Sequence, residues 1–212
     1  MRLSRIPWSE LKYALWLPVY LLSFVLIERL PQTSYWATQL PLDDMIPFCE
    51  WFVLFYCAWY PLLVAVGLYL LLRDVSAFRR YMAFLAVTFF VSVLIWVLFP
   101  NGQDLRPQVF PRENFPTALV AALYHIDTCT NVFPSVHVVG SAGAALAVWD
   151  SPSLCAKPLV KWGTPVLAVL ICISTLFIKQ HAFLDVVSGL VLSLLVAVPI
   201  YLIPWKHAKK MP

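Results

Sequence analysis

Charged residues are scarce in this sequence. Asp, Glu, Lys and Arg make up 12% of the 212 residues, whereas hydrophobic residues make up 61%. Soluble domains contain about 25% charged and about 45–50% apolar residues, so this chain lacks the polar residues that a water-exposed surface requires. The composition excludes a soluble globular protein and indicates an integral membrane protein.

Signals for a metal centre, a repeat architecture or a second domain are also missing. The five cysteines are an odd number and show no metal-ligand spacing. No internal repeat, low-complexity tract or linker composition divides the chain. The N-terminal apolar segment is too long for a cleavable signal peptide and lacks a small-residue cleavage site. We expect one integral membrane domain over residues 1–212.

Six apolar stretches approach the length that a bilayer requires. At about 1.5 Å per residue, a helix needs about 20 residues to cross the ~30 Å hydrocarbon layer. The stretches are residues 11–30, 51–72, 81–99, 134–149, 162–177 and 181–203. They predict an all-α protein, a six-transmembrane-helix bundle, in which the fourth helix is short.

Lys and Arg residues divide unevenly between the two sides of this bundle. If the N-terminus is cytoplasmic, 11 of the 15 fall on the cytoplasmic side: Arg2, Arg5, Lys12, Arg73, Arg79, Arg80, Lys157, Lys161, Lys206, Lys209 and Lys210. The positive-inside rule therefore predicts that both termini are cytoplasmic. The net charge of +4 then reflects topology, and we expect no nucleic-acid partner. The prediction is a multi-pass protein of a cell membrane.

Three polar clusters fall on the extracytoplasmic side of this topology. The first is NGQDLRP, residues 101–107, at the head of the long loop 100–133. Arg106 offers a planar guanidinium that suits phosphate oxygens. It would equally suit an interfacial pair with Asp104 or with lipid headgroups, so this cluster alone does not define a site.

The second cluster is PSVH, residues 134–137, at the start of the fourth stretch. Pro and Ser favour a helix N-terminus, so the backbone amides beside Ser135 would form an anion site. His137 would then be placed to protonate a leaving oxygen. An ordinary helix start with an interfacial His is the alternative. The run GSAGAALA that follows permits close packing and predicts an interior helix.

The third cluster is KQHAFLD, residues 179–185. His181 and Asp185 are four residues apart, which places them on one helix face if the sixth helix begins by Lys179. A carboxylate beside an imidazole fixes its tautomer and stabilises its positive charge, as a nucleophilic histidine requires. Lys179 is either a phosphate-binding cation or a snorkelling lysine at a helix end.

Taken in order, these motifs resemble the type-2 phosphatidic acid phosphatase superfamily. The family pattern is Lys, six residues and Arg-Pro; then Pro-Ser-Gly-His; then Ser-Arg, five residues, His, three residues and Asp. Here Arg106 and Pro107 supply the first motif, residues 134–137 the second, and STLFIKQHAFLD at residues 174–185 the third. The resemblance covers the second half of the chain by motif and the whole chain by its six-helix layout.

Three positions depart from the family pattern. Phe99 replaces the Lys, Val136 replaces the Gly, and Thr175 replaces the Arg that follows the Ser. Two phosphate-binding cations of the family are therefore missing, and Lys179 is the nearest candidate to replace them. The loss of that Arg is similar to the inositol phosphorylceramide synthase branch, which transfers a phosphoryl headgroup between lipids.

The resemblance implies a membrane lipid-phosphate phosphatase that works through a phosphohistidine on the extracytoplasmic side. His181 would attack the phosphorus atom, Asp185 would balance its charge, and His137 would protonate the departing lipid alcohol. The phosphate-binding residues that it implies are Arg106, Ser135 and Lys179. Neither a cofactor nor a metal is implied. A lipid phosphotransferase with an alcohol acceptor, and a non-catalytic lipid transporter, are the alternatives.

Further expectations concern the extracytoplasmic segments. Residues 31–50, with aromatic residues around them, predict an interfacial lid. Cys49 and Cys129 both fall outside, where an oxidising compartment would allow a disulfide. His125 and Asp127 are of metal-ligand type, although we expect His125 to be an interfacial loop residue.

Overall fold

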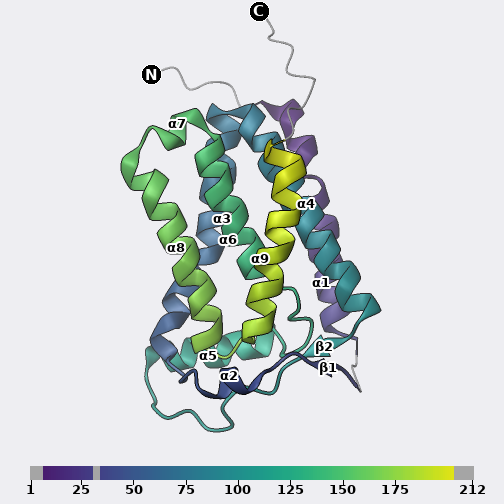
Figure 1. Ribbon diagram of the computed structural model, residues 1–212, viewed down its shortest axis with the longest axis vertical. Coiled ribbons are helices and arrows are strands. Elements are labelled where there is room, and N and C mark those ends of the chain that lie inside the picture. The colour runs from purple at the N-terminus through teal and green to yellow at the C-terminus, as the bar shows by residue number, and fades with distance from the viewer. Residues whose placement is uncertain (1–6, 31–33, 203–212) are drawn as a thin grey trace, which may run out of the picture.

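The computed structural model describes residues 7–30 and 34–202, which form a bundle of helices (Figure 1). The principal helices are α1 (Trp16–Glu28), α3 (Val53–Arg73), α4 (Val75–Leu98), α6 (Val136–Asp150), α8 (Pro158–Phe177) and α9 (Phe183–Ala197). Two 3-10 segments, Trp8–Ala14 and Glu50–Phe52, lead into α1 and α3, and the π-helical turn Val198–Leu202 extends α9. The mainly helical fold expected from the sequence is confirmed.

Short elements cover one end of the bundle, which we call the covered end (Figure 1). They are α2 (Pro41–Asp44), α5 (Phe115–Ile126) and the parallel strands β1 (Trp36–Ala37) and β2 (Asn101–Gly102). The short helix α7 (Pro152–Cys155) lies at the opposite end. Helix α5 forms within the stretch expected to be loop, because Asn114 caps it by accepting a 2.9 Å hydrogen bond from the Thr117 amide.

Within residues 7–30 and 34–202, five helical stretches are long and apolar enough to cross a bilayer: Trp8–Glu28, Glu50–Arg73, Val75–Leu98, Pro158–Phe177 and Phe183–Leu202. The fourth expected span forms α6, whose 15 residues extend only about 22 Å, so six spans are not confirmed. Helix α6 can be short because it is central and most of its residues are buried in protein.

The expected sidedness stays a prediction. Five of the cations on which it depends lie outside the described residues: Arg2, Arg5, Lys206, Lys209 and Lys210. The last residue of the expected sixth span, 203, lies outside them as well.

Small residues allow α6 to lie against its neighbours at close range. A Cβ atom at Gly140 would lie 2.7 Å from Trp59 Nε1, and one at Gly143 would lie 2.8 Å from Phe84 Cδ1. Both distances are shorter than van der Waals contact, so only glycine fits without movement of an aromatic ring. The prediction that residues 134–149 form an interior helix is confirmed.

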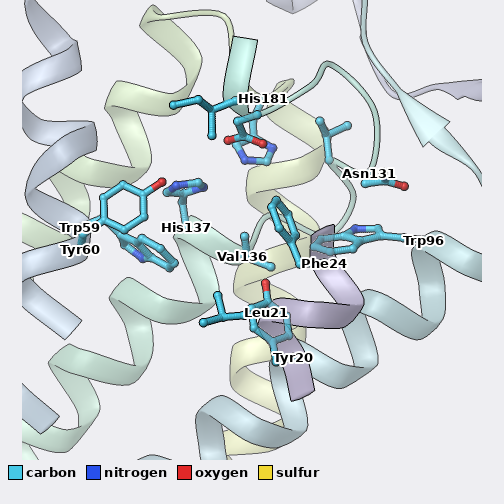
Figure 2. A pocket seen from close by; sticks show the side chains of 13 residues that line it. Tyr20, Leu21, Phe24, Trp59, Tyr60, Trp96, Asn131, Val136, His137 and His181 are labelled. Atoms are coloured by element: carbon cyan, nitrogen blue, oxygen red, sulfur yellow. The ribbon is translucent and has the colours of Figure 1, made fainter. Parts of the chain in front are cut away.

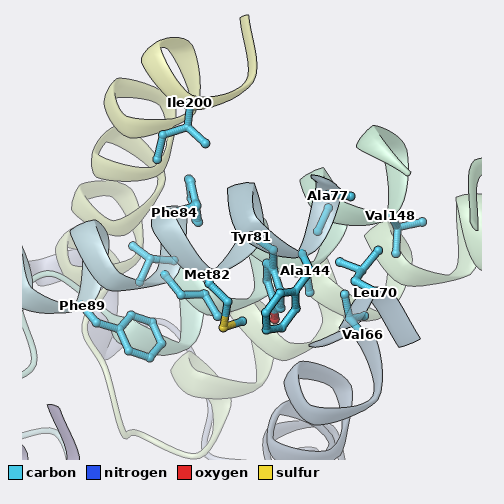
Figure 3. Packing of buried hydrophobic residues seen from close by; sticks show 14 of the residues in the cluster. Val66, Leu70, Ala77, Tyr81, Met82, Phe84, Phe89, Ala144, Val148 and Ile200 are labelled. Atoms are coloured by element: carbon cyan, nitrogen blue, oxygen red, sulfur yellow. The ribbon is translucent and has the colours of Figure 1, made fainter. Parts of the chain in front are cut away.

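The core is built around this central helix. Figure 3 shows Ala144 of α6 beside Tyr81 of α4 and beside Val66 and Leu70 of α3, all within one cluster of buried residues. The outward faces of the surrounding helices are also apolar; Val64, for example, is 60% exposed. A core with an apolar exterior is what a bilayer-embedded bundle requires.

Ion pairs fasten the end of the bundle opposite the covered end. Arg79 of α4 pairs with Glu10 at 2.6 Å, and Arg80 pairs with Asp150 at the end of α6 at 2.7 Å. These contacts hold the N-terminal helix and the central helix against α4.

Replacing Gly143 with Ala should destabilise the protein. The new Cβ would press on the Phe84 ring, which is completely buried, and overpacking of this kind costs about 1–3 kcal/mol. Gly163→Ala is the matched control, because nothing lies within 4 Å of a Cβ there; alanine should raise stability by about 1 kcal/mol at that helical position. Thermal unfolding in detergent measures both, and equal stability of the two variants would contradict the packing of α6 on α4.

Candidate active site

Two histidines share a cavity near the covered end. His137 is the second residue of α6 and His181 lies between α8 and α9, and their ring centroids are 5.6 Å apart. They are 3% and 5% exposed and line one cavity of about 130 Å³ (Figure 2). Neither ring nitrogen of His137 has a hydrogen-bond partner among the described residues. Both imidazoles are therefore placed to contact one group bound in this cavity.

Asp185 lies directly behind His181. Its Oδ2 atom is 3.6 Å from His181 Nδ1, and its side chain is completely buried. This distance is within ion-pair range but longer than a hydrogen bond. The expected pair is present, although the two residues do not share a helix face: α9 begins at Phe183, two residues after the expected start at residue 181 and after His181 itself. Asp185 causes this later start by accepting a 2.7 Å hydrogen bond from the Ala182 amide, which caps the helix.

Ser135, at the start of α6, is hydrogen-bonded to the backbone of Asp185. Its amide donates to the backbone oxygen of Asp185 at 3.2 Å, and its hydroxyl accepts from the Val138 amide at 3.4 Å. Ser135 is thus the N-cap that the sequence predicted. The amides of Val136 and His137 follow it, at positions whose N–H groups have no partner within a helix.

Buried amide groups fix the loop that carries His181. The amides of Gln180 and His181 both donate to the Thr175 carbonyl, at 2.9 and 3.1 Å. The side chain of Gln103 donates to the Lys179 carbonyl at 2.9 Å. The loop is therefore held from α8 on one side and from residues 101–107 on the other.

Arg106 lies close to this loop but does not line the cavity. Its Nη2 atom donates to the Asp127 carbonyl at 2.6 Å and to Gln180 Oε1 at 2.9 Å. Its guanidinium lies over the Tyr124 ring, 4.1 Å from the centroid. Arg106 thus lies beside Gln180, the neighbour of His181, and its Nη atoms donate to protein oxygens. Its buried Nε atom has no partner among the described residues.

Lys179 is also committed to a protein oxygen. Its Nζ atom donates to the Asp43 carbonyl at 2.7 Å, and the residue is only 7% exposed. Burial lowers the pKa of this ammonium, although the nearby carboxylates of Asp43 and Asp44 act in the opposite direction. Lys179 does not line the cavity, whose lining residues include neither Lys nor Arg.

Two residues of the cavity region were not singled out as site residues from the sequence. Asp127 lines the cavity, and Tyr56 donates a 2.6 Å hydrogen bond to its Oδ2 atom. The Tyr56 ring lies 4.2 Å from the His137 ring, centroid to centroid. The signal for Asp127 was an acidic residue shortly before PSVH, whereas nothing local marks Tyr56 within its apolar helix.

The His, Cys, Asp and Glu residues in the ranges 7–30 and 34–202 are dispersed with respect to metal binding. No three His, Cys, Asp or Glu side chains in these ranges are grouped so that they could hold a metal ion. His125 is exposed and does not line the cavity, in contrast to Asp127.

Asn101 holds the backbone that leads into PSVH. Its Oδ1 atom accepts from the amides of Val132 and Phe133 at 2.9 and 2.8 Å, and its Nδ2 atom donates to the Phe99 carbonyl at 2.8 Å. The residue is completely buried. The sequence offered only its position at the start of NGQDLRP, so its role emerges from the structure.

The segment 34–50 lies against the site loop. Asp43 Oδ1 accepts a 2.7 Å hydrogen bond from the Phe183 amide, which adds to the contact between Asp43 and Lys179. The lid function predicted for residues 31–50 stays a prediction, and residues 31–33 lie outside the described ranges.

The expected disulfide is wrong, because Cys49 and Cys129 are free thiols. The Cys49 amide donates to Phe177 at the end of α8, whereas the Cys129 carbonyl accepts from Gln103. The two backbones are thus fixed to different neighbours.

A comparison with protein families identifies the fold. A family model, the PAP2 superfamily, matches residues 80–209, which is more than half of the chain and includes both histidines and Asp185. The chain belongs to the PAP2 superfamily. No curated protein and no solved structure matches it. PAP2 proteins hydrolyse phosphate esters or transfer phosphoryl groups, so this chain is a phosphatase-type or phosphotransferase-type lipid enzyme of a membrane.

Replacing Asn101 with Ala should loosen the approach to PSVH. Each buried backbone group left unpaired costs about 1–3 kcal/mol, so hydrogen exchange across residues 127–137 should accelerate. Asn114→Ala removes the cap of α5 and a 2.9 Å hydrogen bond to Glu50, neither of which involves residues 132–137. It serves as the matched control, with a loss of about 1 kcal/mol for the cap and unchanged exchange across 132–137. Equal exchange in the two variants would show that Asn101 does not hold this segment.

Proposed function

We propose that this PAP2 protein hydrolyses a membrane lipid phosphate through a phosphohistidine intermediate. The observation that carries the proposal is the shared cavity of His137 and His181, with the buried Asp185 carboxylate 3.6 Å from His181 Nδ1. A histidine backed by a carboxylate is a suitable nucleophile, and a second histidine is a suitable acid and base.

The proposed reaction has two steps. His181 attacks through Nε2, because Nδ1 faces Asp185 and holds the proton that this carboxylate stabilises. The new Nε2–P bond forms as the bond between phosphorus and the lipid oxygen breaks, and His137 gives its proton to that oxygen. A water molecule then attacks phosphorus, His137 takes up the proton from the water, and the Nε2–P bond breaks to release inorganic phosphate.

Positive charge must balance the phosphoryl oxygens in both steps. We assign this role to Arg106 and Lys179, together with the α6 N-terminus that Ser135 caps. Arg106 donates a hydrogen bond to Gln180, which is the residue beside His181. Lys179 would have to exchange its hydrogen bond to Asp43 for one to phosphate. The helix N-terminus contributes a partial positive charge without any rearrangement.

We propose that the covered end faces the extracytoplasmic side of a cell membrane. The Lys and Arg distribution supports this orientation. The substrate headgroup then reaches the cavity from the outer leaflet while its hydrocarbon chains stay in the bilayer.

His181→Ala should abolish phosphate release from lipid phosphates by the purified protein in detergent. The variant has no nucleophile, so the rate should fall by at least about a thousandfold, and a chelator should leave the wild-type rate unchanged. Gly163→Ala, at a helical position where nothing lies within 4 Å of an added Cβ, should keep most activity. Release by wild type that persists in His181→Ala would contradict the phosphohistidine mechanism, and no release from any lipid phosphate would favour a transferase or a non-catalytic transporter.

Phosphotransfer to an alcohol, as in the inositol phosphorylceramide synthase branch, is the second candidate function. The observation that favours it is the Asp127 carboxylate on the cavity wall, beside a site whose lining lacks a cation. A carboxylate only accepts hydrogen bonds, so it suits a hydroxyl group of an acceptor better than a phosphate oxygen.

Asp127→Asn should therefore lower transfer to an alcohol more than hydrolysis. An amide oxygen is a weaker acceptor than a carboxylate, so loss of one charge-assisted hydrogen bond should cost transfer about tenfold. Tyr56→Phe is the companion variant, because it removes the partner of Asp127 and leaves the carboxylate in place. Product analysis with glycerol or inositol in the assay gives the ratio of transfer to hydrolysis, and an unchanged ratio in Asp127→Asn would exclude acceptor binding by Asp127.

A further inference from the structure

A second cavity continues from the catalytic cavity into the membrane-spanning part of the bundle. It has a volume of about 460 Å³ and lies between the N-terminal helix, α3 and α4. Four residues line both cavities: Tyr20, Leu21, Trp59 and Tyr60. The rest of its lining is formed by apolar residues and Gly67. We call this second cavity the chain groove.

The chain groove runs most of the way along α3. It begins at Trp59, whose ring lies 4.5 Å from the His137 ring, centroid to centroid, and it ends near Leu71 and Phe78. The helical rise from Trp59 to Leu71, at about 1.5 Å per residue, is about 18 Å, against ~30 Å for the hydrocarbon layer. The groove therefore leads from the histidines past the middle of the bilayer.

One wall of the groove is the N-terminal helical segment, and polar contacts hold this segment to the rest of the bundle at both of its ends. Glu28, the last residue of α1, accepts hydrogen bonds from Thr128 and Asn131 of the loop before PSVH. At the other end, Glu10 pairs with Arg79 of α4 at 2.6 Å. Between these points, Tyr20 packs on Phe89 of α4 with ring centroids 4.8 Å apart.

We propose that the chain groove holds one hydrocarbon chain of the substrate while its phosphate lies at His137 and His181. This inference rests on the proposed function and names the substrate class as phosphates of long single or multiple chains. Continuity with the catalytic cavity favours the substrate chain over bulk lipid, because a chain attached to a bound phosphate passes Tyr20 and Trp59 directly. Most of the groove lining lies before residue 80, outside the part that matches the family.

Gly67 gives the groove its depth. A Cβ at this position would meet only Tyr81 Cε1 at 3.7 Å and Met82 Cε at 3.9 Å, so alanine fits in ordinary contact. A phenylalanine ring is larger than this space, and because Gly67 lines the groove, we expect the ring to occupy part of it. Val64 lines the groove nearly one turn closer to the histidines, and its 60% exposure makes a larger side chain compatible with folding.

The test compares butyl, octyl, dodecyl and hexadecyl phosphate as substrates of wild type, Gly67→Phe and Val64→Trp. A blocked groove would displace the phosphate of a long-chain substrate, and small displacements at a reacting centre cost about a hundredfold. We expect kcat/KM for hexadecyl phosphate to fall at least about tenfold, with that for butyl phosphate within about twofold of wild type. Gly163→Phe and Val169→Trp, on α8 and away from the groove, are matched controls for bulk.

An unchanged dependence on chain length in both groove variants would overturn the inference, whereas the proposed function would stand. Absence of hydrolysis by wild type would instead count against the proposed function. In that case, hexadecyl phosphate with a diazirine at the far end of its chain tests the groove directly. Photolabelling of residues 63–71 in wild type that is lost in Val64→Trp and kept in Val169→Trp would support the groove, and equal labelling in all three would overturn it.

Discussion

The site depends on a single buried carboxylate residue. Asp185 is completely buried, and in a bilayer-embedded bundle such a group must be compensated locally. Its side chain caps α9 through the Ala182 amide, its backbone carbonyl accepts from Ser135 at the start of α6, and its Oδ2 atom lies 3.6 Å from His181. One residue thus caps one helix, joins it to the start of the central helix and places a carboxylate within ion-pair distance of the proposed nucleophile.

Among the described residues, few positively charged side chains lie near the cavity, and none of them lines it. Arg106 and Lys179 both lie near the loop of His181, yet each donates to a backbone carbonyl, of Asp127 and Asp43 respectively. An uncompensated cation in such a place would be costly, so the fold pairs both cations with protein oxygens. The family pattern has Lys and Arg where this chain has Phe99 and Thr175, so this site has fewer cations to bind phosphate. Phosphate binding would then depend more on the helix N-terminus and on protonated histidine.

The central position of α6 explains why it is an interior helix, as expected, and why its length does not confirm a sixth membrane span. Its small residues predicted an interior helix, and Gly140 and Gly143 lie directly against Trp59 and Phe84. Because it is enclosed by protein, α6 can be shorter than a lipid-exposed span, so its length alone leaves the expected sixth span unconfirmed. The same packing places Trp59 of α3 against His137, where the catalytic cavity meets the chain groove.

Local sequence determined the membrane class, the principal helices and the histidine and carboxylate residues, because apolar length, capping residues and motif spacing are short-range properties. Tertiary structure alone decided that Tyr56 and Asp127 lie at the cavity, that Asn101 holds the approach to PSVH, and that Cys49 and Cys129 remain free thiols. It also decided where Arg106 and Lys179 direct their donors. These features join residues about 20 to 140 positions apart, and such contacts arise only when helix packing brings distant backbone and side-chain groups into one small volume.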